Sequence, residues 1–338
     1  MQNRGTLRLG GALLGGALAI LSAAAGDGVS LVRVQRLWDA RPHCAFTDLC
    51  RHHGRWWCVF REGPAHVSPD GAIRVLTSSD GREWTSAARL THGRADLRDP
   101  KVCRAPDGRL MLTAAGAWHQ PAPHRHQTFA WFSADGRDWG RPVPIGEPDF
   151  WLWRVSWHAG EAAAVGYRTR GEPLLRVYHS RNGREFTPLI ARWNVPADAN
   201  ETTLRALRDG RWLAVVRRDG RPGTALLGTA SALEGPWTWR DLGAHLGGPN
   251  WIELPDGRLI AAGRIHEGGV HTALLWLDPE RARLRECLRL PSGGDTSYPG
   301  LVWHAHRLWV SYYSSHEEHT AIYLAEVSVP PRSSAPAP

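Results

Sequence analysis

Residues 200–220 read NETTLRALRDGRWLAVVRRDG, and the pattern within this stretch decides the fold. Two apolar runs typical of β-strands, TTLRAL and RWLAVVR, flank the turn sequence Arg208-Asp209-Gly210. The pattern predicts an antiparallel hairpin. Such a hairpin places Glu201, at the start of the first strand, close to Arg217, at the end of the second. The pair is therefore either a surface salt bridge or part of a functional site.

The turn and its second strand recur six times, with a period near 50 residues. An apolar strand precedes each copy and another follows it. Repeats of this length indicate a modular architecture in which each copy is one small antiparallel sheet. The six copies are HHGRWWCVF (52–60), PDGRLMLTA (106–114), HAGEAAAVG (158–166), RDGRWLAVV (208–216), PDGRLIAAG (255–263) and HAHRLWVSY (304–312).

A second short motif lies further along four of the repeats. Its Asx-Gly pair favours a tight turn, its serine and Asx side chains can bond turn amides, and its aromatic residue can pack beneath the turn. We interpret Asp80, Asp135 and Asn182 in this motif as structural. The copies are SSDGREW (78–84), SADGRDW (133–139), SRNGREF (180–186) and the degraded SALEGPW (231–237).

Together these patterns predict an all-β protein, a six-bladed β-propeller with four-stranded antiparallel blades, as one domain over residues 30–329. The sixth repeat supplies only about three strands. The free strand SLVRVQRLW (30–38) can complete that blade by pairing within residues 308–328. Closing the ring in this way removes exposed sheet edges, which favours it.

The two ends of the chain differ in composition from the repeats. Residues 1–25 combine Arg4 and Arg8, an apolar run and the small residues SAAAG, which is typical of a cleaved signal peptide. A membrane anchor is the alternative, but the run is short and glycine-rich. We expect a secreted or periplasmic protein with no membrane association after cleavage, and a disordered tail at 330–338.

Composition narrows the possible partners. The formal net charge is +8, and 41 residues are Lys or Arg, with Lys101 as the lysine among them. The arginines are spread along the chain, which disfavours nucleic acid, whereas a basic excess suits an acidic substrate. Of the five cysteines, Cys50 and Cys58 flank a turn and could form a disulfide. No CxxC pair is present, so we expect neither a metal site nor a cofactor.

In a propeller, the first strand of each blade lines the central channel, so its start and the end of the second strand meet at one face. Arginine, carboxylate and aromatic residues occupy these positions. Because arginine matches carboxylates with a planar fork, several on one face predict recognition of an anionic ligand. Each arginine alone could instead lie on a solvated blade edge. The candidates are Arg61, His66, Arg98, Asp99, Trp153, Arg154, Asn200, Glu201, Arg217, Asn250, Arg264, Asp295 and Tyr298.

Several motifs of this chain resemble those of the sialidase (neuraminidase) superfamily, in particular of bacterial exo-α-sialidases. The turn motif resembles that family's Asp-box, although each copy is one residue shorter, and residues 200–217 and 297–315 resemble two of its strand pairs. The resemblance implies a retaining mechanism in which Tyr298 is the nucleophile and Glu201 accepts its proton. It also implies that Arg217 and Arg264 bind the carboxylate of the sugar.

The chain departs from the family at two places. Blade one begins with CAFTDL (44–49) where the family has an Arg-Ile-Pro motif, so Arg61, Arg98 or Arg154 would have to replace one arginine. The loop that carries the family's acid/base aspartate offers His66 and Asp70 here. Asp99 is a third candidate for this role.

The sequence therefore predicts an exported exo-glycosidase that removes a terminal sialic-acid-like or other acidic sugar from glycans. A non-catalytic propeller that binds glycans through the same face is one alternative. A polysaccharide lyase that acts on a uronic acid, with His66 and Tyr298 as acid and base, is another.

Overall fold

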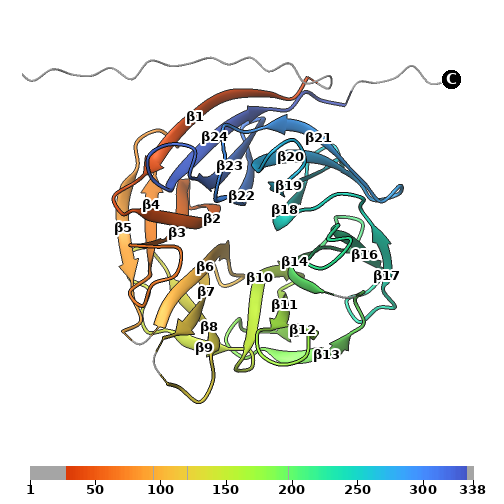
Figure 1. The fold of residues 1–338 in the computed structure, drawn as a ribbon, viewed down its shortest axis with the longest axis horizontal. Coiled ribbons are helices and arrows are strands. Elements are labelled where there is room, and N and C mark those ends of the chain that lie inside the picture. The colour runs from red at the N-terminus through yellow and green to blue at the C-terminus, as the bar shows by residue number, and fades with distance from the viewer. Residues whose placement is uncertain (1–27, 94, 120, 197, 333–338) are drawn as a thin grey trace, which may run out of the picture.

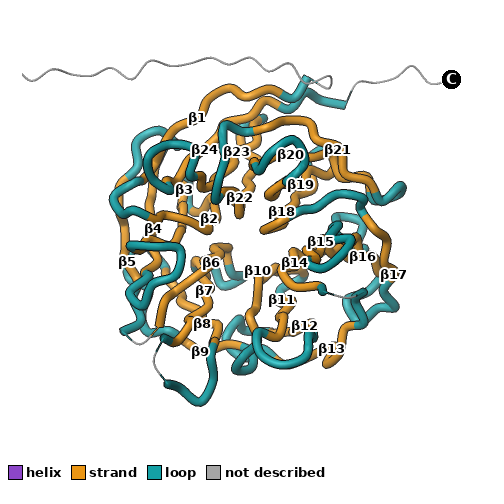
Figure 2. The backbone as a smooth tube through the Cα atoms, viewed as in Figure 1, coloured by secondary structure: helices purple, strands orange, loops and turns teal. Residues whose placement is uncertain are grey.

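The computed structural model describes residues 28–93, 95–119, 121–196 and 198–332. These residues form six four-stranded antiparallel sheets arranged around a central channel, and they contain no α-helix (Figures 1 and 2). The predicted six-bladed β-propeller is confirmed. Each repeat of the sequence is one blade, with its first strand at the channel and its last strand at the rim.

The strands of the first three blades are listed here from the channel outward. Blade one has β2 (His43–His52), β3 (Arg55–Gly63), β4 (Ala72–Ser78) and β5 (Thr85–Leu90). Blade two has β6 (Ala95–Arg104), β7 (Leu110–Trp118), β8 (His126–Ser133) and β9 (Val143–Ile145). Blade three has β10 (Phe150–His158), β11 (Glu161–Arg168), β12 (Leu175–Ser180) and β13 (Thr187–Trp193).

The remaining blades follow the same order. Blade four has β14 (Ala199–Ala206), β15 (Trp212–Arg218), β16 (Leu226–Ala230) and β17 (Thr238–Asp241). Blade five has β18 (Gly247–Glu253), β19 (Leu259–Ile265), β20 (His271–Asp278) and β21 (Arg283–Arg289). Blade six has β22 (Thr296–His304), β23 (Arg307–Ser314), β24 (Ala321–Ser328) and β1 (Ser30–Trp38).

Strand β1 closes the ring, as predicted. It pairs antiparallel with β24 from Ser30 opposite Ser328 to Trp38 opposite Ile322, on the outer side of blade six (Figure 1). The N-terminal strand thus supplies the fourth strand of a blade whose other three come from the C-terminal end of the chain. This pairing covers an edge of β24 that would otherwise be free to aggregate.

The hydrophobic core lies between blades rather than within them. Six clusters of buried apolar side chains each draw mainly on two neighbouring blades, so every blade interface is a core of its own. The Asx-Gly turns reinforce these interfaces. A Cβ built on Gly136, a blade-two turn residue, would lie 2.2 Å from the ring of Trp57 in blade one, so only glycine fits there.

The turn motif forms the contacts that its sequence predicts. In blade two, the Gly136 amide donates to Ser133 Oγ at 2.8 Å, and the amides of Arg137 and Asp138 donate to Asp135 Oδ1. Trp139 is buried beneath the turn and donates to the Gly136 carbonyl at 3.0 Å. The equivalent side chains of Asp80 and Asn182 make the same amide contacts. These residues are structural.

The suggested disulfide between Cys50 and Cys58 is wrong. Cys58 lies opposite Leu49 in the ladder, and Cys50 lies opposite Trp57. Because neighbouring residues of a strand point to opposite faces, the two thiols lie on different faces of the sheet. All five cysteines are free.

The predicted signal peptide and most of the predicted tail lie outside the described residues. In the described part of the chain, no helix is long and apolar enough to span a membrane.

Closure by β1 predicts a large contribution to stability. We expect a chain that begins at residue 39 to lose about 3 kcal/mol or more of unfolding free energy, or to aggregate, relative to one that begins at residue 28. The reason is that the shorter chain leaves β24 as a free edge. Chemical denaturation of both chains measures the difference. Equal stabilities would show that the β1–β24 pairing does not hold the ring closed.

Candidate active site

All six innermost strands carry a β-bulge at the same height. In each blade, the pairing between the first and second strands skips two residues of the first strand and only one of the second. A bulge of this kind re-aims side chains and is common beside active sites. The skipped pairs are Phe46 and Thr47, Asp99 and Pro100, Trp153 and Arg154, Asn200 and Glu201, Gly248 and Pro249, and Tyr298 and Pro299.

The sequence explains why the chain bulges here. In three blades the second skipped residue is a proline, which has no amide hydrogen to donate to a ladder. Phe46, Asp99, Gly248 and Tyr298 adopt positive φ angles of 62°, 48°, 60° and 49°. For residues other than glycine this conformation costs of order 1–3 kcal/mol each. The strain falls on the residues that surround the channel mouth.

Tyr298 and Glu201 meet across this mouth from two blades. The Tyr298 hydroxyl donates to Glu201 Oε1 at 2.6 Å, which confirms the predicted contact. Arg217 Nη1 lies 3.0 Å from the Tyr298 hydroxyl and 2.9 Å from Glu201 Oε1. The Gly248 amide donates to Glu201 Oε2 at 2.9 Å. Glu201 and Arg217 are therefore not an isolated salt bridge, because a buried phenol shares both of them.

The electrostatics of this group keep the phenol neutral at rest. Burial, and after it the charge of Glu201, raises the pKa of Tyr298 well above its ordinary value, with Arg217 opposing. Burial also disfavours the Arg217 cation, but Glu201, Tyr298 and Asp219 outweigh burial and raise the pKa of Arg217. The resting state is thus a phenol that donates to a carboxylate, with a permanent cation beside both.

The Tyr298 ring is held on several sides. The rings of Phe46 and Trp153 contact it edge-on, with centroids 5.2 and 5.5 Å away. The Arg264 guanidinium lies 5.5 Å from its centroid. A Cβ on Gly248 would come within 2.7 Å of the ring. Tyr298 therefore has little freedom to change its orientation.

Asp99 is a buried carboxyl group in the bulge of blade two. Its side chain is shielded from solvent, and its Oδ1 has no hydrogen-bond partner among the described residues. Burial raises the pKa of Asp99 and outweighs the opposing charges of Lys101 and Arg98, while the charge of Glu201 adds to the rise. Beneath it, Lys101 donates to the carbonyls of Asp99 and Pro100 and lies 4.5 Å from the Trp153 ring centroid. Burial lowers the pKa of Lys101 to about 8.

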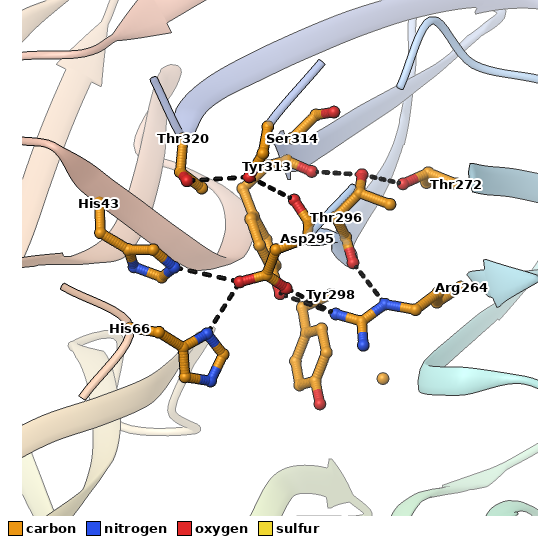
Figure 3. Close-up of polar contacts among 12 residues, drawn as sticks. His43, His66, Arg264, Thr272, Asp295, Thr296, Tyr298, Tyr313, Ser314 and Thr320 are labelled. Atoms are coloured by element: carbon orange, nitrogen blue, oxygen red, sulfur yellow. Dashed lines mark hydrogen bonds and ion pairs between the residues drawn. The ribbon is translucent and has the colours of Figure 1, made fainter. Parts of the chain in front are cut away.

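Asp295 organises the other side of the mouth (Figure 3). Its Oδ1 accepts hydrogen bonds from Tyr313 at 2.7 Å and from Arg264 Nη2 at 3.0 Å. Its Oδ2 lies 3.1 Å from His43 Nε2 and 2.8 Å from His66 Nδ1. Burial disfavours the Asp295 carboxylate, but the hydrogen bonds from His43, His66 and Tyr313 outweigh burial and keep its pKa well below the ordinary value.

The structure does not bring Arg61 to the mouth, where it was predicted to bind substrate. Arg61 is fully buried and forms a bidentate ion pair with Asp96, at 2.7 and 3.1 Å, while its Nη1 donates to the Ala65 carbonyl at 2.9 Å. Arg98 reaches the same carboxylate at 3.3 Å and donates to the His66 carbonyl at 2.6 Å. Both arginines hold the loop that carries His66.

Arg154 and Asn250 also lie away from the mouth. Arg154 pairs with Asp48 at 2.8 Å and lines a cavity of about 370 Å³ around the opposite ends of the innermost strands. Asn250 is buried, accepts from Arg205 and donates to the Pro299 carbonyl at 2.9 Å. Their predicted roles in substrate binding at the mouth are corrected, because the hydrogen bonds and the ion pair that these two side chains form lie within the channel.

Asn200 lies at the outer edge of the site. Its side chain donates to Asp219 Oδ2 at 2.6 Å and accepts from the Glu201 amide. Arg217 Nε donates to Asp219 Oδ1 at 2.8 Å. Asn200 and Asp219 therefore orient the first strand pair of blade four, including the carboxylate and the arginine at its end.

Sequence reasoning expected Asp295 at the mouth but gave it no role, and it did not single out His43 or Tyr313 as site residues. His43 directly precedes CAFTDL, and Asp295 precedes the strand that carries Tyr298. Only the closure of the ring brings blade one beside blade six, so their spacing in the sequence gives no signal. Lys101 does have a signal in the sequence. It is the one lysine of an arginine-rich chain, and it directly follows an Asp-Pro pair.

Comparisons with known proteins show the fold and no family. No family model matches the chain, and no curated protein matches it. The structure is similar to that of a protein of unknown function from Dyadobacter fermentans, with a TM-score of 0.78 and 19% identity over 90% of this chain and 100% of that chain.

Two enzymes are also similar in structure. The α-L-arabinanase of Penicillium chrysogenum, complexed with arabinobiose, has a TM-score of 0.70 and 14% identity over 85% of this chain and 94% of that chain. The sialidase of Trypanosoma rangeli, complexed with sialic acid, has a TM-score of 0.64 and 13% identity over 89% of this chain and 59% of that chain. At these identities the likeness is one of fold alone: the chain shares its β-propeller fold with these proteins.

Proposed function

We propose that this protein is an exported retaining glycoside hydrolase that releases a terminal sugar from glycans, with Tyr298 and Glu201 as its catalytic pair. The observation that carries the proposal is the 2.6 Å contact between the Tyr298 hydroxyl and Glu201, with Arg217 beside both atoms. A glycan-binding propeller has no need of a phenol and a carboxylate that share a proton. The fold shared with an arabinanase and a sialidase adds support.

The chemistry proceeds in two displacements. In the first, Glu201 accepts the phenolic proton while the Tyr298 oxygen attacks the anomeric carbon, and the bond to the leaving oxygen breaks as Asp99 protonates it. In the second, Asp99 removes a proton from water, which attacks the anomeric carbon. The bond to Tyr298 then breaks, and the phenol recovers its proton from Glu201. Two inversions give overall retention of configuration.

Arg217 supplies the electrostatic part of this mechanism. It lies 3.0 Å from the oxygen on which negative charge develops when the phenol loses its proton. A cation fixed at that place before the reaction stabilises the developing charge without reorganisation. The raised pKa of Tyr298 makes a neighbouring base necessary, and Glu201 is already in contact.

Asp99 suits the acid role better than His66. Burial raises its pKa, so it holds its proton at a pH where an ordinary aspartate has lost it. His66, in contrast, has its Nδ1 engaged by Asp295 and half of its side chain exposed. We therefore assign proton transfer to the leaving group to Asp99.

The substrate we favour is an acidic sugar of the sialic-acid type. A 2-keto acid sugar carries a carboxylate on its anomeric carbon, which repels an anionic nucleophile and makes a neutral phenol the better choice. Arg217 and Arg264 flank Tyr298, where they could bind that carboxylate.

We also propose that residues 1–25 direct export of the protein and are then removed. N-terminal sequencing of the exported protein should find Gly26 as its first residue.

A neutral furanoside is the second candidate, and one observation favours it. Both flanking arginines already have carboxylate partners: Arg217 pairs with Glu201 and Asp219, and Arg264 pairs with Asp295. A site whose cations are paired in this way can accept an uncharged sugar such as an α-L-arabinofuranoside. Glu201 would then be the nucleophile, because carboxylates serve that role in most retaining glycosidases, and Tyr298 would orient it.

Covalent trapping separates these candidates. We expect a fluorogenic screen of sialosides, other ulosonides, uronides and α-L-arabinofuranosides to identify one cleaved class. The matching fluorinated sugar should then label the protein, and peptide mass spectrometry should place the label on Tyr298 for an acidic sugar or on Glu201 for a neutral one. Binding of glycans without cleavage or label would indicate a lectin, and an unsaturated product would indicate a lyase.

Removal of single functional groups tests the catalytic pair. Tyr298→Phe removes one hydroxyl, and for an acidic substrate we expect kcat to fall by at least about 10³-fold, as for other lost nucleophiles. Glu201→Gln should lower kcat by roughly 10²–10⁴-fold because it removes the base. Tyr312→Phe is the matched control, since its hydroxyl bonds the Pro291 carbonyl away from the mouth. Full activity in Tyr298→Phe would exclude Tyr298 as nucleophile.

The role of Asp99 predicts a dependence on the leaving group and on pH. Asp99→Asn should nearly abolish cleavage of natural glycans but spare aryl glycosides, whose leaving groups depart without protonation. The acid must be protonated, so kcat/KM in the wild type should decline as the pH rises through the raised pKa of Asp99. That decline should be absent from the aryl-glycoside profile of Asp99→Asn. If His66→Ala shows this behaviour and Asp99→Asn does not, His66 is the acid.

A further inference from the structure

His43, His66 and Asp295 form a cluster at the edge of the mouth that the proposed mechanism does not use (Figure 3). Their facing atoms, His43 Nε2, His66 Nδ1 and a carboxylate oxygen of Asp295, all lie within 4.8 Å of one another. We propose that this cluster is a binding site for a transition-metal ion, with Zn²⁺ as the reference ion. The proposal does not rest on the proposed glycosidase activity.

The spacing of the ligand atoms fits a single ion. Zn²⁺ binds imidazole nitrogen and carboxylate oxygen at about 2.0–2.2 Å in tetrahedral geometry, so two such ligands lie about 3.4 Å apart. Asp295 Oδ2 is 3.1 Å from His43 Nε2 and 2.8 Å from His66 Nδ1. His43 Nε2 and His66 Nδ1 lie within 4.8 Å of each other, so modest shifts of the side chains bring all three ligand atoms to that spacing. Each imidazole must be neutral and carry its proton on the other ring nitrogen, His43 Nδ1 or His66 Nε2, so that the facing nitrogen can coordinate the ion.

The backbone of all three ligands is fixed in advance. His43 begins β2, and the following amide, of Cys44, donates to the Thr320 carbonyl of blade six at 2.9 Å. Asp295 directly precedes β22 in the same blade. The loop of His66 is held by Arg98, which donates to the His66 carbonyl at 2.6 Å, and by Arg61 through the preceding carbonyl. A preorganised set of ligands loses little conformational freedom when it binds an ion.

Two neighbouring side chains orient the Asp295 carboxylate toward the two histidines. Tyr313 and Arg264 both donate to Asp295 Oδ1, which leaves Oδ2 directed at His43 and His66. Groups that fix a ligating carboxylate in this way are typical of metal sites. The charge of Arg264 offsets part of the carboxylate charge, so we expect micromolar rather than nanomolar affinity.

The ligand set selects the class of ion. Two imidazoles with one carboxylate suit Zn²⁺, Co²⁺, Ni²⁺ and Cu²⁺, whereas Ca²⁺ and Mg²⁺ prefer sites made of oxygen atoms. Three protein ligands leave a fourth position open for water or a sugar hydroxyl. The side chain of His66 is 51% exposed, so solvent and ligands can reach that position. The absence of a CxxC pair, which led us to expect no metal site, carries no information about a site built from two histidines and a carboxylate.

The test is metal binding to the full chain produced without a polyhistidine tag. We expect titration with Co²⁺ to give the visible absorption of a tetrahedral site, and added Zn²⁺ to abolish that absorption by displacing Co²⁺. Calorimetry should find one Zn²⁺ site per chain that includes His43, His66 and Asp295. His66→Ala should weaken Zn²⁺ binding at least tenfold. Asp295→Asn should do the same, because it removes the charge of the carboxylate. Circular dichroism verifies that each variant folds.

His319→Ala is the matched control, because His319 is exposed in blade six and lies outside the cluster. Its affinity for Zn²⁺ should equal that of the wild type. His66 is partly exposed and lies in a loop, so its loss should leave the fold intact. The proposal is wrong if the wild type shows no saturable binding. It is also wrong if folded His66→Ala and Asp295→Asn bind Zn²⁺ as tightly as the wild type.

Discussion

The site depends on one backbone constraint, which is the β-bulge that each of the six innermost strands forms at the same height. A regular strand alternates its side chains between two faces, so neighbouring residues cannot both serve the channel mouth. The extra residue breaks that alternation in the strands that carry Asp99, Glu201 and Tyr298, and it lets Tyr298 and Glu201 meet across the mouth. The positive φ angles of Asp99 and Tyr298 are part of its cost. The stable interfaces between blades bear this strain.

Arginine in this protein serves mainly to build and orient the site. Arg61 and Arg98 fix the loop of His66, Arg264 fixes Asp295, and Arg217 lies against Tyr298 and Glu201. Each of these cations faces a carboxylate, so the mouth is less basic than the arginine count of the chain suggests. Because these cations are already paired, an uncharged sugar is a second candidate substrate beside an acidic one. It also explains how Asp295, held from one side by Tyr313 and Arg264, can offer its other oxygen to an ion.

The repeats predicted the fold because a turn signal every 50 residues depends only on local chemistry. The contact between Glu201 and Tyr298 was also predictable, since both begin channel-lining strands. The prediction that Arg154 and Asn250 lie at the mouth was wrong, and the reason is the same for both residues. Arg154 lies within a bulge and Asn250 directly follows one. A bulge inserts one residue, so the direction of side chains in it and after it cannot be read from simple alternation. His43 and Asp295 are distant in sequence, and only the closed ring makes them neighbours.

The central claim is that Tyr298 and Glu201 form the catalytic pair of a retaining glycosidase, and stereochemistry tests it most directly. Proton NMR can follow cleavage of an identified substrate and record which anomer appears before mutarotation mixes the two. The account predicts that the first product has the same anomeric configuration as the substrate, because two displacements restore it. A first product of opposite configuration would require a single displacement by water, and it would contradict a covalent intermediate on either residue.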